Sequence, residues 1–148
     1  MRFTEGNLGR VFVLRLGDGD RLPEVLEEFA EKKNVASAVC FLLGGAKEKS
    51  KVVVGPKDGA VLPPEPMAVL LGGVHEVCGV GTIFKDEIGQ PKLHMHASFG
   101  RNEKSVTGCV RLGVEIWRIG EVVMLEILGV EARRAIDKET GFEFLEIT

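Results

Sequence analysis

Three histidines and one cysteine are the residues whose types and spacing point most directly to chemistry in this sequence. His94 and His96 are separated by one residue in the segment LHMHASF, residues 93–99. Side chains of a β-strand alternate between its two faces, so His94 and His96 are expected to point the same way while Met95 packs on the opposite face. Two imidazoles placed in this way can chelate one metal ion. Two polar residues on a solvated face are the alternative.

Cys109 is the expected third ligand of this ion. The polar segment GRNEK, residues 100–104, predicts a hairpin centred between Asn102 and Glu103, and that centre places Cys109 directly across from His96. Two imidazoles and a thiolate suit zinc or a similar divalent transition metal and leave a fourth coordination position open. A register slip of one residue would instead turn Cys109 into the apolar core.

His75 is a further candidate ligand for the same ion. The strand expected at residues 77–84 pairs with the strand of the histidines, and this pairing leaves His75 several residues away along the strand. His75 is therefore expected to be a ligand only if a neighbouring subunit supplies it. The same pairing predicts that Gly79 and Gly81 lie beside the two histidines, where the absence of side chains would leave room for a ligand.

The elements that must position these residues are mostly strands. A helix is predicted at residues 21–33, with an N-terminal cap from the aspartates of the segment DGD at 18–20. Apolar or alternating segments bounded by turn residues predict strands, among them 9–16, 36–43, 77–84, 92–99, 105–114 and 142–147. The predicted fold class is α+β, a mostly antiparallel sheet of about seven strands with one main helix.

Length and charge limit the classes of protein to which this chain can belong. Its 148 residues are expected to form a single domain, 1–148, since no linker or repeat divides them. A net charge of −3 argues against broad, non-specific binding to nucleic acid, which needs many cationic side chains on one face. No segment has the character of a membrane span or a signal peptide, and the three cysteines form no CxxC pair. A cytoplasmic protein is therefore expected.

Other kinds of active site find no support in the sequence. It contains no GxSxG elbow, P-loop, HExxH segment or dinucleotide-binding glycine pattern. Tyrosine is absent and Trp117 is the sole tryptophan, so the sequence has few of the aromatic side chains on which nucleic-acid bases stack. Cys40 and Cys78 lie inside apolar segments and are expected to be buried.

The order of these motifs resembles the PPC domain (plant and prokaryote conserved domain). This domain follows AT-hooks in a family of plant nuclear proteins and stands alone in many bacteria and archaea, and the present sequence resembles the stand-alone form. GRVFVL at residues 9–14 resembles the family's opening strand, and residues 93–99 resemble its L-H-x-H-x-S-like strand. Trp117 with GEVV at 120–123 resembles the closing strand, and Gly-Cys at 108–109 falls where many members have Gly-His.

The resemblance implies a compact α+β domain that forms a homotrimer through its sheets and carries histidines suspected of binding metal. Cys109 keeps a zinc-compatible ligand where many members have histidine, which leaves the identity of the metal open. In the plant relatives, DNA binding resides in the AT-hook, whose Arg-Gly-Arg-Pro core is absent here. Direct DNA binding is therefore not expected, and no well-established reaction comes with the family.

Three functions are compatible with these observations. The first is a metal-containing homotrimeric interaction or regulatory module that binds itself and a protein partner. The second is a metal-dependent enzyme that acts on a small molecule through an open zinc-like site, with Glu76 and Glu115 as acidic neighbours. The third is a DNA-binding protein that uses the basic residues Arg10, Arg15, Arg101, Lys104 and Arg111. A closed metal site would favour the first function, and a site open on a cleft with a nearby glutamate would favour the second.

Overall fold

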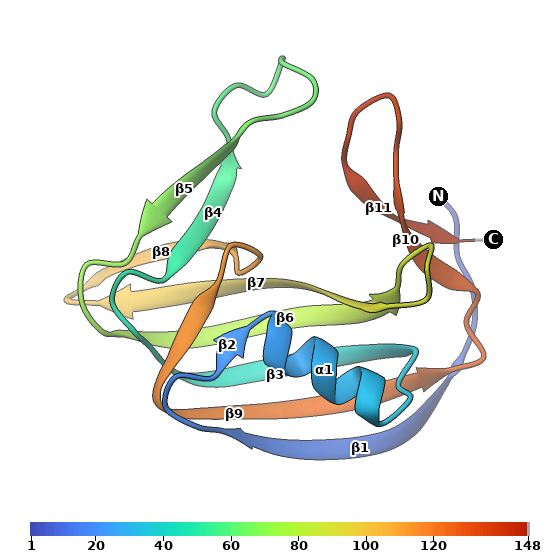
Figure 1. The fold of residues 1–148 in the computed structure, drawn as a ribbon, viewed down its shortest axis with the longest axis horizontal. Helices are drawn as coiled ribbons and strands as arrows, with labels where there is room; N and C mark the ends of the chain where they lie inside the picture. Colours follow the sequence, from blue (N-terminus) through green and yellow to red (C-terminus); the bar gives the residue numbers. More distant parts are fainter. Residues whose placement is uncertain (148) are drawn as a thin grey trace.

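One short helix and a large antiparallel sheet make up the computed structural model, which describes residues 1–147 (Figure 1). Thr148, the last residue of the expected domain 1–148, lies outside the described residues. The elements, in chain order, are β1 (Asn7–Leu16), β2 (Arg21–Leu22), α1 (Glu24–Lys32), β3 (Ser37–Ala46), β4 (Lys51–Pro56), β5 (Pro66–Leu70), β6 (His75–Lys85), β7 (Pro91–Arg101), β8 (Lys104–Cys109), β9 (Val114–Leu128), β10 (Ala132–Ile136) and β11 (Glu143–Ile147). The predicted α+β class is confirmed.

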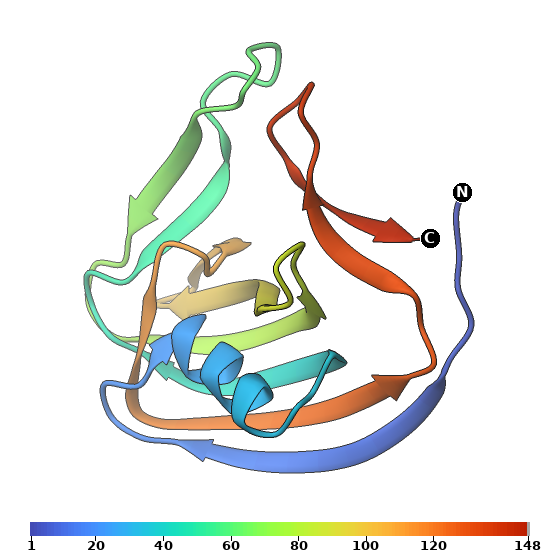
Figure 2. The same cartoon turned by 45° about the vertical axis from the view of Figure 1, so that its right-hand side comes forward.

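A nine-stranded sheet forms the body of the molecule. Its strands lie in the order β1–β9–β3–β6–β7–β8–β4–β5, and β2 pairs with one end of β9. β10 and β11 form a separate two-stranded hairpin. Figures 1 and 2 show the β4–β5 and β10–β11 hairpins rising on the same side of the molecule. β7 is held by hydrogen-bonded neighbours on both sides, so the direction of its side chains is fixed.

The hydrophobic core lies on the face of the sheet that α1 covers. Met95 and Ala97 of β7 are buried there, while His94 and His96 on the alternate positions are exposed, as the strand period predicts. Burial of a side chain as large as methionine or leucine stabilises the fold by about 1.5–3 kcal/mol. No helix in the described part of the chain has the length and apolar character that crossing a bilayer requires.

The helix begins later than its sequence pattern predicts. The predicted span is 21–33, but α1 starts at Glu24 and has Pro23 at its N-cap position, with no side-chain hydrogen bond to cap it. The expected aspartate cap is wrong, because Asp18 and Asp20 accept hydrogen bonds from amides outside the helix. The segment before Pro23 is extended and pairs with β9 as β2.

The strands also depart from prediction, since residues 1–147 contain eleven rather than about seven. The predicted strand 105–114 is two strands, because the chain turns between β8 and β9 and the Gly113 amide bonds the Val110 carbonyl. β3 does not stop before its glycines but continues to Ala46. A Cβ on Gly44 would collide with the Ile119 carbonyl oxygen of β9, so glycine permits this close approach.

A buried carboxylate joins the edge strand β1 to β9. Glu126 is 5% exposed and accepts hydrogen bonds from three nitrogens of Arg10, the backbone amide at 3.0 Å, Nε at 2.7 Å and Nη2 at 2.6 Å. The side-chain and backbone hydrogen bonds from Arg10 lower the pKa of Glu126 from 4.5 to about 2. The ionised form of Glu126 is therefore part of the folded structure.

Replacement of Glu126 with glutamine is expected to destabilise the protein at neutral pH by about 2 kcal/mol, because the charged acceptor of these hydrogen bonds is lost. The pKa of Glu126 is lower in the folded than in the unfolded state, so its contribution is present above pH 4.5 and is lost as the pH falls toward about 2. Urea denaturation of both proteins across this range measures the effect. Glu146→Gln breaks the exposed pair with Arg133 and serves as control. A difference between wild type and Glu126→Gln that is constant with pH would contradict the assignment.

Candidate metal centre

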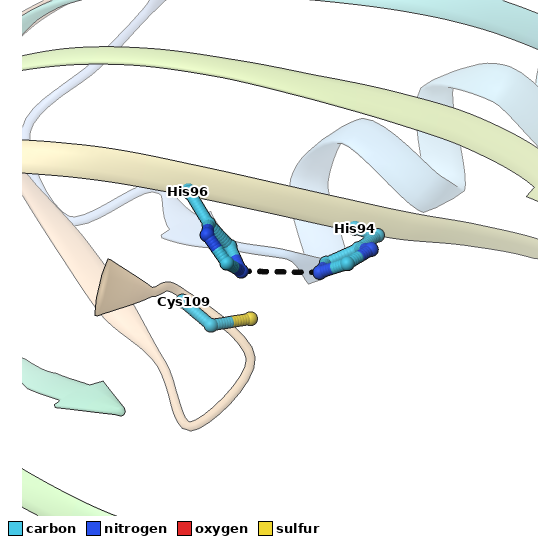
Figure 3. Close-up of side chains that lie close together, drawn as sticks. All are labelled: His94, His96 and Cys109. Atoms are coloured by element: carbon cyan, nitrogen blue, oxygen red, sulfur yellow. Dashed lines mark hydrogen bonds between the residues drawn. The ribbon is translucent and has the colours of Figure 1, made fainter. Parts of the chain in front are cut away.

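Two neighbouring strands place the candidate ligands side by side. His94 and His96 project from the same face of β7 (Figure 3). β7 and β8 form a hairpin whose register pairs His96 directly with Cys109, as the hairpin centre in the sequence predicts. Cys109 also pairs with Val53 of β4, so strands on both sides hold its backbone. The three side chains converge because the strand period and the hairpin register both direct them to one face.

The ligand atoms lie close enough to share an ion. Nε2 of His94 is 3.1 Å from Nε2 of His96, and the three ligand atoms, including Sγ of Cys109, lie within 4.8 Å of one another. Ligand atoms bonded to a tetrahedral zinc ion at about 2.0–2.3 Å are separated by about 3.3–3.8 Å. Small side-chain rotations bring the three atoms into this range. The donor set therefore fits a zinc-like ion and leaves a fourth position free.

The surroundings of His94 favour its neutral form, which is the form that binds metal. Burial lowers the pKa of His94 below 6.5, and the positive charges of Arg134, His96 and Arg111 lower it further.

The thiol of Cys40 is unsuited to metal binding. Cys40 is fully buried in the core, and burial raises the pKa of its thiol to about 12, so it stays protonated and inert.

The candidate centre opens on a cavity of about 510 Å³. Arg111 and Glu143 are the charged residues that line the cavity beside the candidate ligands. Its apolar walls come from the two hairpins that rise on one side of the molecule in Figure 2, with Pro63 and Pro64 from the β4–β5 loop and Phe142 from the loop between β10 and β11. An ion held by these three side chains would therefore border a space large enough for a small molecule.

The structure does not bring His75 to this centre within one chain. His75 is the first residue of β6, where it pairs with Ala46, and its Nδ1 lies 2.9 Å from the carbonyl oxygen of Gly73. The strand pairing separates it from His96 by several residues, as the sequence predicts. Within the described chain, His75 therefore stands apart from the other three candidate ligands.

The structure confirms the predicted pairing of residues 77–84 with 92–99, which places two glycines near the histidines on the neighbouring strand. Gly79 pairs with Ala97 and Gly81 with Met95, on the face of β6 that packs in the core. A Cβ on either glycine would lie within 3.0 Å of the Cβ of its partner, so these glycines allow close packing of the core. Gly81 also lines a small pocket together with His94 and His96. Val80 and Thr82 are the direct cross-strand partners of the histidines.

Another expectation that fails concerns the acidic neighbours. Glu76 pairs with Gly100 beyond the site and Glu115 pairs with Arg21 of β2, so neither lines the cavity. Glu143 of β11 takes that place. No local pattern links Glu143 to the histidine segment, because only the path of the chain from β9 through β10 brings it there. Cys78, expected to be buried, is exposed on the same face as the histidines.

Comparison with solved structures places this fold among known proteins, whereas no curated protein matches the chain. A PPC protein of Pyrococcus horikoshii has a TM-score of 0.85 and 23% identity, with 100% of this chain and 99% of that chain covered. A metal-containing protein of Archaeoglobus fulgidus has a TM-score of 0.83 and 26% identity, with 99% of both chains covered. A protein of Ralstonia eutropha, named as a proposed DNA-binding protein, has a TM-score of 0.72, 20% identity and coverage of 92% and 90%.

The family itself is identified by the sequence. Residues 3–128 match the family model described as the Plants and Prokaryotes Conserved (PCC) domain. The match contains the whole nine-stranded sheet with His94, His96 and Cys109, and it ends before the β10–β11 hairpin that supplies one wall of the cavity. The chain belongs to the Plants and Prokaryotes Conserved domain family, the PPC domain that its motifs resemble.

Proposed function

We propose that this protein is a metal-containing homotrimeric module in which His94, His96 and Cys109 hold zinc or a similar divalent transition metal. The observation that carries the proposal is the convergence of two imidazole nitrogens and a thiol from paired strands within 4.8 Å. A structural relative from Archaeoglobus fulgidus, 26% identical, is named as metal-containing. Elemental analysis of protein purified without a polyhistidine tag tests the proposal, with about one ion per chain expected from a single three-ligand centre.

The homotrimer is supported by a stripe of exposed apolar side chains on the sheet face that carries the histidines. Val13, Val123, Phe41 and Val80 are cross-strand neighbours on β1, β9, β3 and β6, and they are 81%, 39%, 47% and 52% exposed. A contiguous apolar surface of this kind is typical of a protein interface. We assign further copies of this chain as its occupant, in keeping with the trimer that the family resemblance implies.

The apolar stripe of Val13, Val123, Phe41 and Val80 also runs directly to the metal centre. Val80 pairs with His96, and His96 in turn pairs with Cys109. Assembly through the stripe would therefore bring a neighbouring subunit up to the metal centre. In such a trimer, His75 of a neighbouring subunit is the alternative third ligand to Cys109.

The cavity favours a second candidate function, a metal-dependent enzyme that acts on a small molecule. The free coordination position faces a cavity of about 510 Å³ that also contains Glu143, which is the arrangement expected of an open catalytic site. A bound divalent ion would polarise a substrate oxygen or lower the pKa of a water molecule. Glu143 would then accept the proton, and Pro63, Pro64 and Phe142 would exclude bulk water.

The basic residues considered for DNA binding do not form one surface. Arg10 is paired with Glu126, Arg15 of β1 lies opposite Glu121, and Arg101 donates a hydrogen bond to a loop carbonyl. Arg10 and Arg101 also stand on strands that β9, β3 and β6 separate. Within residues 1–147, these three arginines therefore do not form the continuous cationic track that duplex DNA requires.

We therefore expect no measurable binding to a duplex of about 20 base pairs at ~150 mM salt, where non-specific phosphate contacts are mostly lost. Fluorescence anisotropy with a labelled duplex, titrated with protein at concentrations up to about 10 μM, measures this binding. The same titration at low salt reports residual electrostatic attraction. Sub-micromolar affinity at ~150 mM salt would contradict the expectation and favour a direct role at DNA.

A further inference from the structure

A buried guanidinium beside the candidate metal centre forms no direct ion pair with a carboxylate of residues 1–147. Arg134 of β10 is 5% exposed, and its Nη2 donates a hydrogen bond of 2.8 Å to Oγ1 of Thr82, the cross-strand neighbour of His94. Its Nε is buried and finds no hydrogen-bond partner among residues 1–147. None of the ion pairs in this part of the chain includes Arg134. The Phe84 ring and the charge of Glu143 compensate Arg134 in part. A buried guanidinium without a direct ion pair is still costly, which points to a ligand that completes the compensation.

A second guanidinium approaches the centre from the opposite side of the histidines. Arg111 follows Cys109 in the turn after β8, is exposed, and lines the cavity together with His96 and Cys109. It takes part in none of the ion pairs within residues 1–147. Arg111 lines the cavity with His94 and His96, and Arg134 contacts Thr82, the cross-strand partner of His94, so both guanidiniums lie next to the histidine pair.

The charges in this volume do not balance. The proposed centre would add a divalent cation to the two arginines, and the anions present are the Cys109 thiolate and Glu143. Positive charge in a partly buried cavity attracts an anion, and arginine binds carboxylates and phosphates through paired N–H groups. The remaining walls, Pro63, Pro64 and Phe142, are apolar, which favours an anion that carries a hydrocarbon group.

We propose that the free position of the metal centre and the adjoining cavity bind a small organic carboxylate, with Arg111 as its ion-pair partner and Arg134 as a buried positive charge beyond the histidines. The inference rests on the proposed metal centre, since one carboxylate oxygen would take the fourth coordination position. The apolar walls contact the rest of the ligand. This assigns a ligand class to the cavity for both the regulatory and the enzymatic function.

Cobalt(II)-loaded protein provides the test, because the visible spectrum of cobalt changes when an anion enters its coordination sphere. Benzoate is the probe, inorganic phosphate is the competing class of anion, and chloride controls for ionic strength. Arg111→Gln is expected to raise the benzoate concentration for a half-maximal spectral shift about tenfold, the loss of a charge-assisted hydrogen bond. Arg133→Gln is the matched control, since Arg133 pairs with Glu146 and is exposed. It should leave the shift unchanged.

Arg134→Gln is expected to weaken benzoate binding by a smaller factor, about threefold, because its charge acts without direct contact. Should this variant fail to fold, the comparison of Arg111→Gln with Arg133→Gln still decides the matter. Stoichiometric cobalt without a benzoate-dependent shift would overturn the inference and leave the metal centre in place. A shift produced by phosphate at lower concentration than by benzoate would overturn the assignment to carboxylates.

A protein that takes up no cobalt would overturn the proposed metal centre instead. In that case, calorimetric titration of the metal-free protein with benzoate separates the two proposals. Heat of binding that Arg111→Gln abolishes and Arg133→Gln retains would support the anion cavity alone. No heat of binding would remove the cavity assignment as well.

Discussion

Replacement of both His94 and His96 with alanine is expected to leave the purified protein without stoichiometric metal. The double variant removes two of the three ligand atoms that lie within 4.8 Å of one another, and Cys109 alone cannot chelate an ion. Complete zinc sites contribute about 10–16 kcal/mol, so the loss of two ligands should weaken binding by more than about 1,000-fold. Inductively coupled plasma mass spectrometry of wild type and variant, purified without a tag, measures the metal content.

Single variants assign the remaining ligand. Cys109→Ser should weaken metal binding less than the double variant, because water or another side chain can replace the thiolate. His75→Ala is the matched histidine control and should retain the metal, since His75 is distant from the other candidates within one chain. Loss of metal in His75→Ala would show that His75 of a neighbouring subunit is the third ligand. Stoichiometric metal in the double histidine variant would show that the site lies elsewhere.

Phe41→Glu is expected to convert the homotrimer to monomers. Phe41 is 47% exposed at the middle of the apolar stripe, between Val123 and Val80. A carboxylate buried there in each subunit would be unpaired, and such a charge costs several kcal/mol per subunit. Gel filtration coupled to light scattering measures the mass, which should fall from about three times 16.1 kDa to 16.1 kDa.

Ile88→Glu is the control for this change, because Ile88 is 83% exposed in the turn between β6 and β7, away from the apolar stripe. It should remain a trimer. Wild-type protein that is monomeric at micromolar concentration would remove the proposed interface. A trimer that survives Phe41→Glu would place the interface on another surface.

The local geometry of the candidate centre could be predicted from the sequence because it depends on short-range rules. The alternation of residues 93–99 fixes the common face of His94 and His96, and a turn of few residues fixes the register that sets His96 opposite Cys109. Both rules operate within about 17 residues of chain, where few competing arrangements exist. The antiparallel sheet followed in the same way from closely spaced strands and turns.

The register of β6 against β7 could also be predicted, since the expected pairing of residues 77–84 with 92–99 is the one observed, with Val77 opposite Phe99 and Phe84 opposite Lys92. Gly79 and Gly81 lie near the histidines on the neighbouring strand, as this pairing predicts, while the direct cross-strand partners of the histidines are Val80 and Thr82. The turn between the strands is stabilised by Asp86, whose carboxylate accepts hydrogen bonds from two amides of the turn, and its length sets the register. In this register the strand period of two places the two glycines on the core face with Met95 and Ala97, and it places Val80 and Thr82 on the face of the histidines.

The cavity could not be predicted from the sequence, because segments that are far apart along the chain line it. Pro63, Arg111 and Glu143 come from three separate parts of the chain, and none has a pattern that refers to the others. β10 also carries two arginines among its five residues, which hides its strand character. The role of Arg134 could not be predicted for the same reason, because only the packing of β10 near β6 places Arg134 beside Thr82.

Anomalous diffraction from crystals of the native protein, recorded on both sides of the zinc absorption edge, tests the central claim most directly. The account predicts one anomalous peak per chain, within about 2.0–2.3 Å of Nε2 of His94, Nε2 of His96 and Sγ of Cys109. The open coordination position of this ion should face the cavity that Arg111 and Glu143 line. A metal-replete crystal with its anomalous peak elsewhere, or with no peak between these three side chains, would contradict the account.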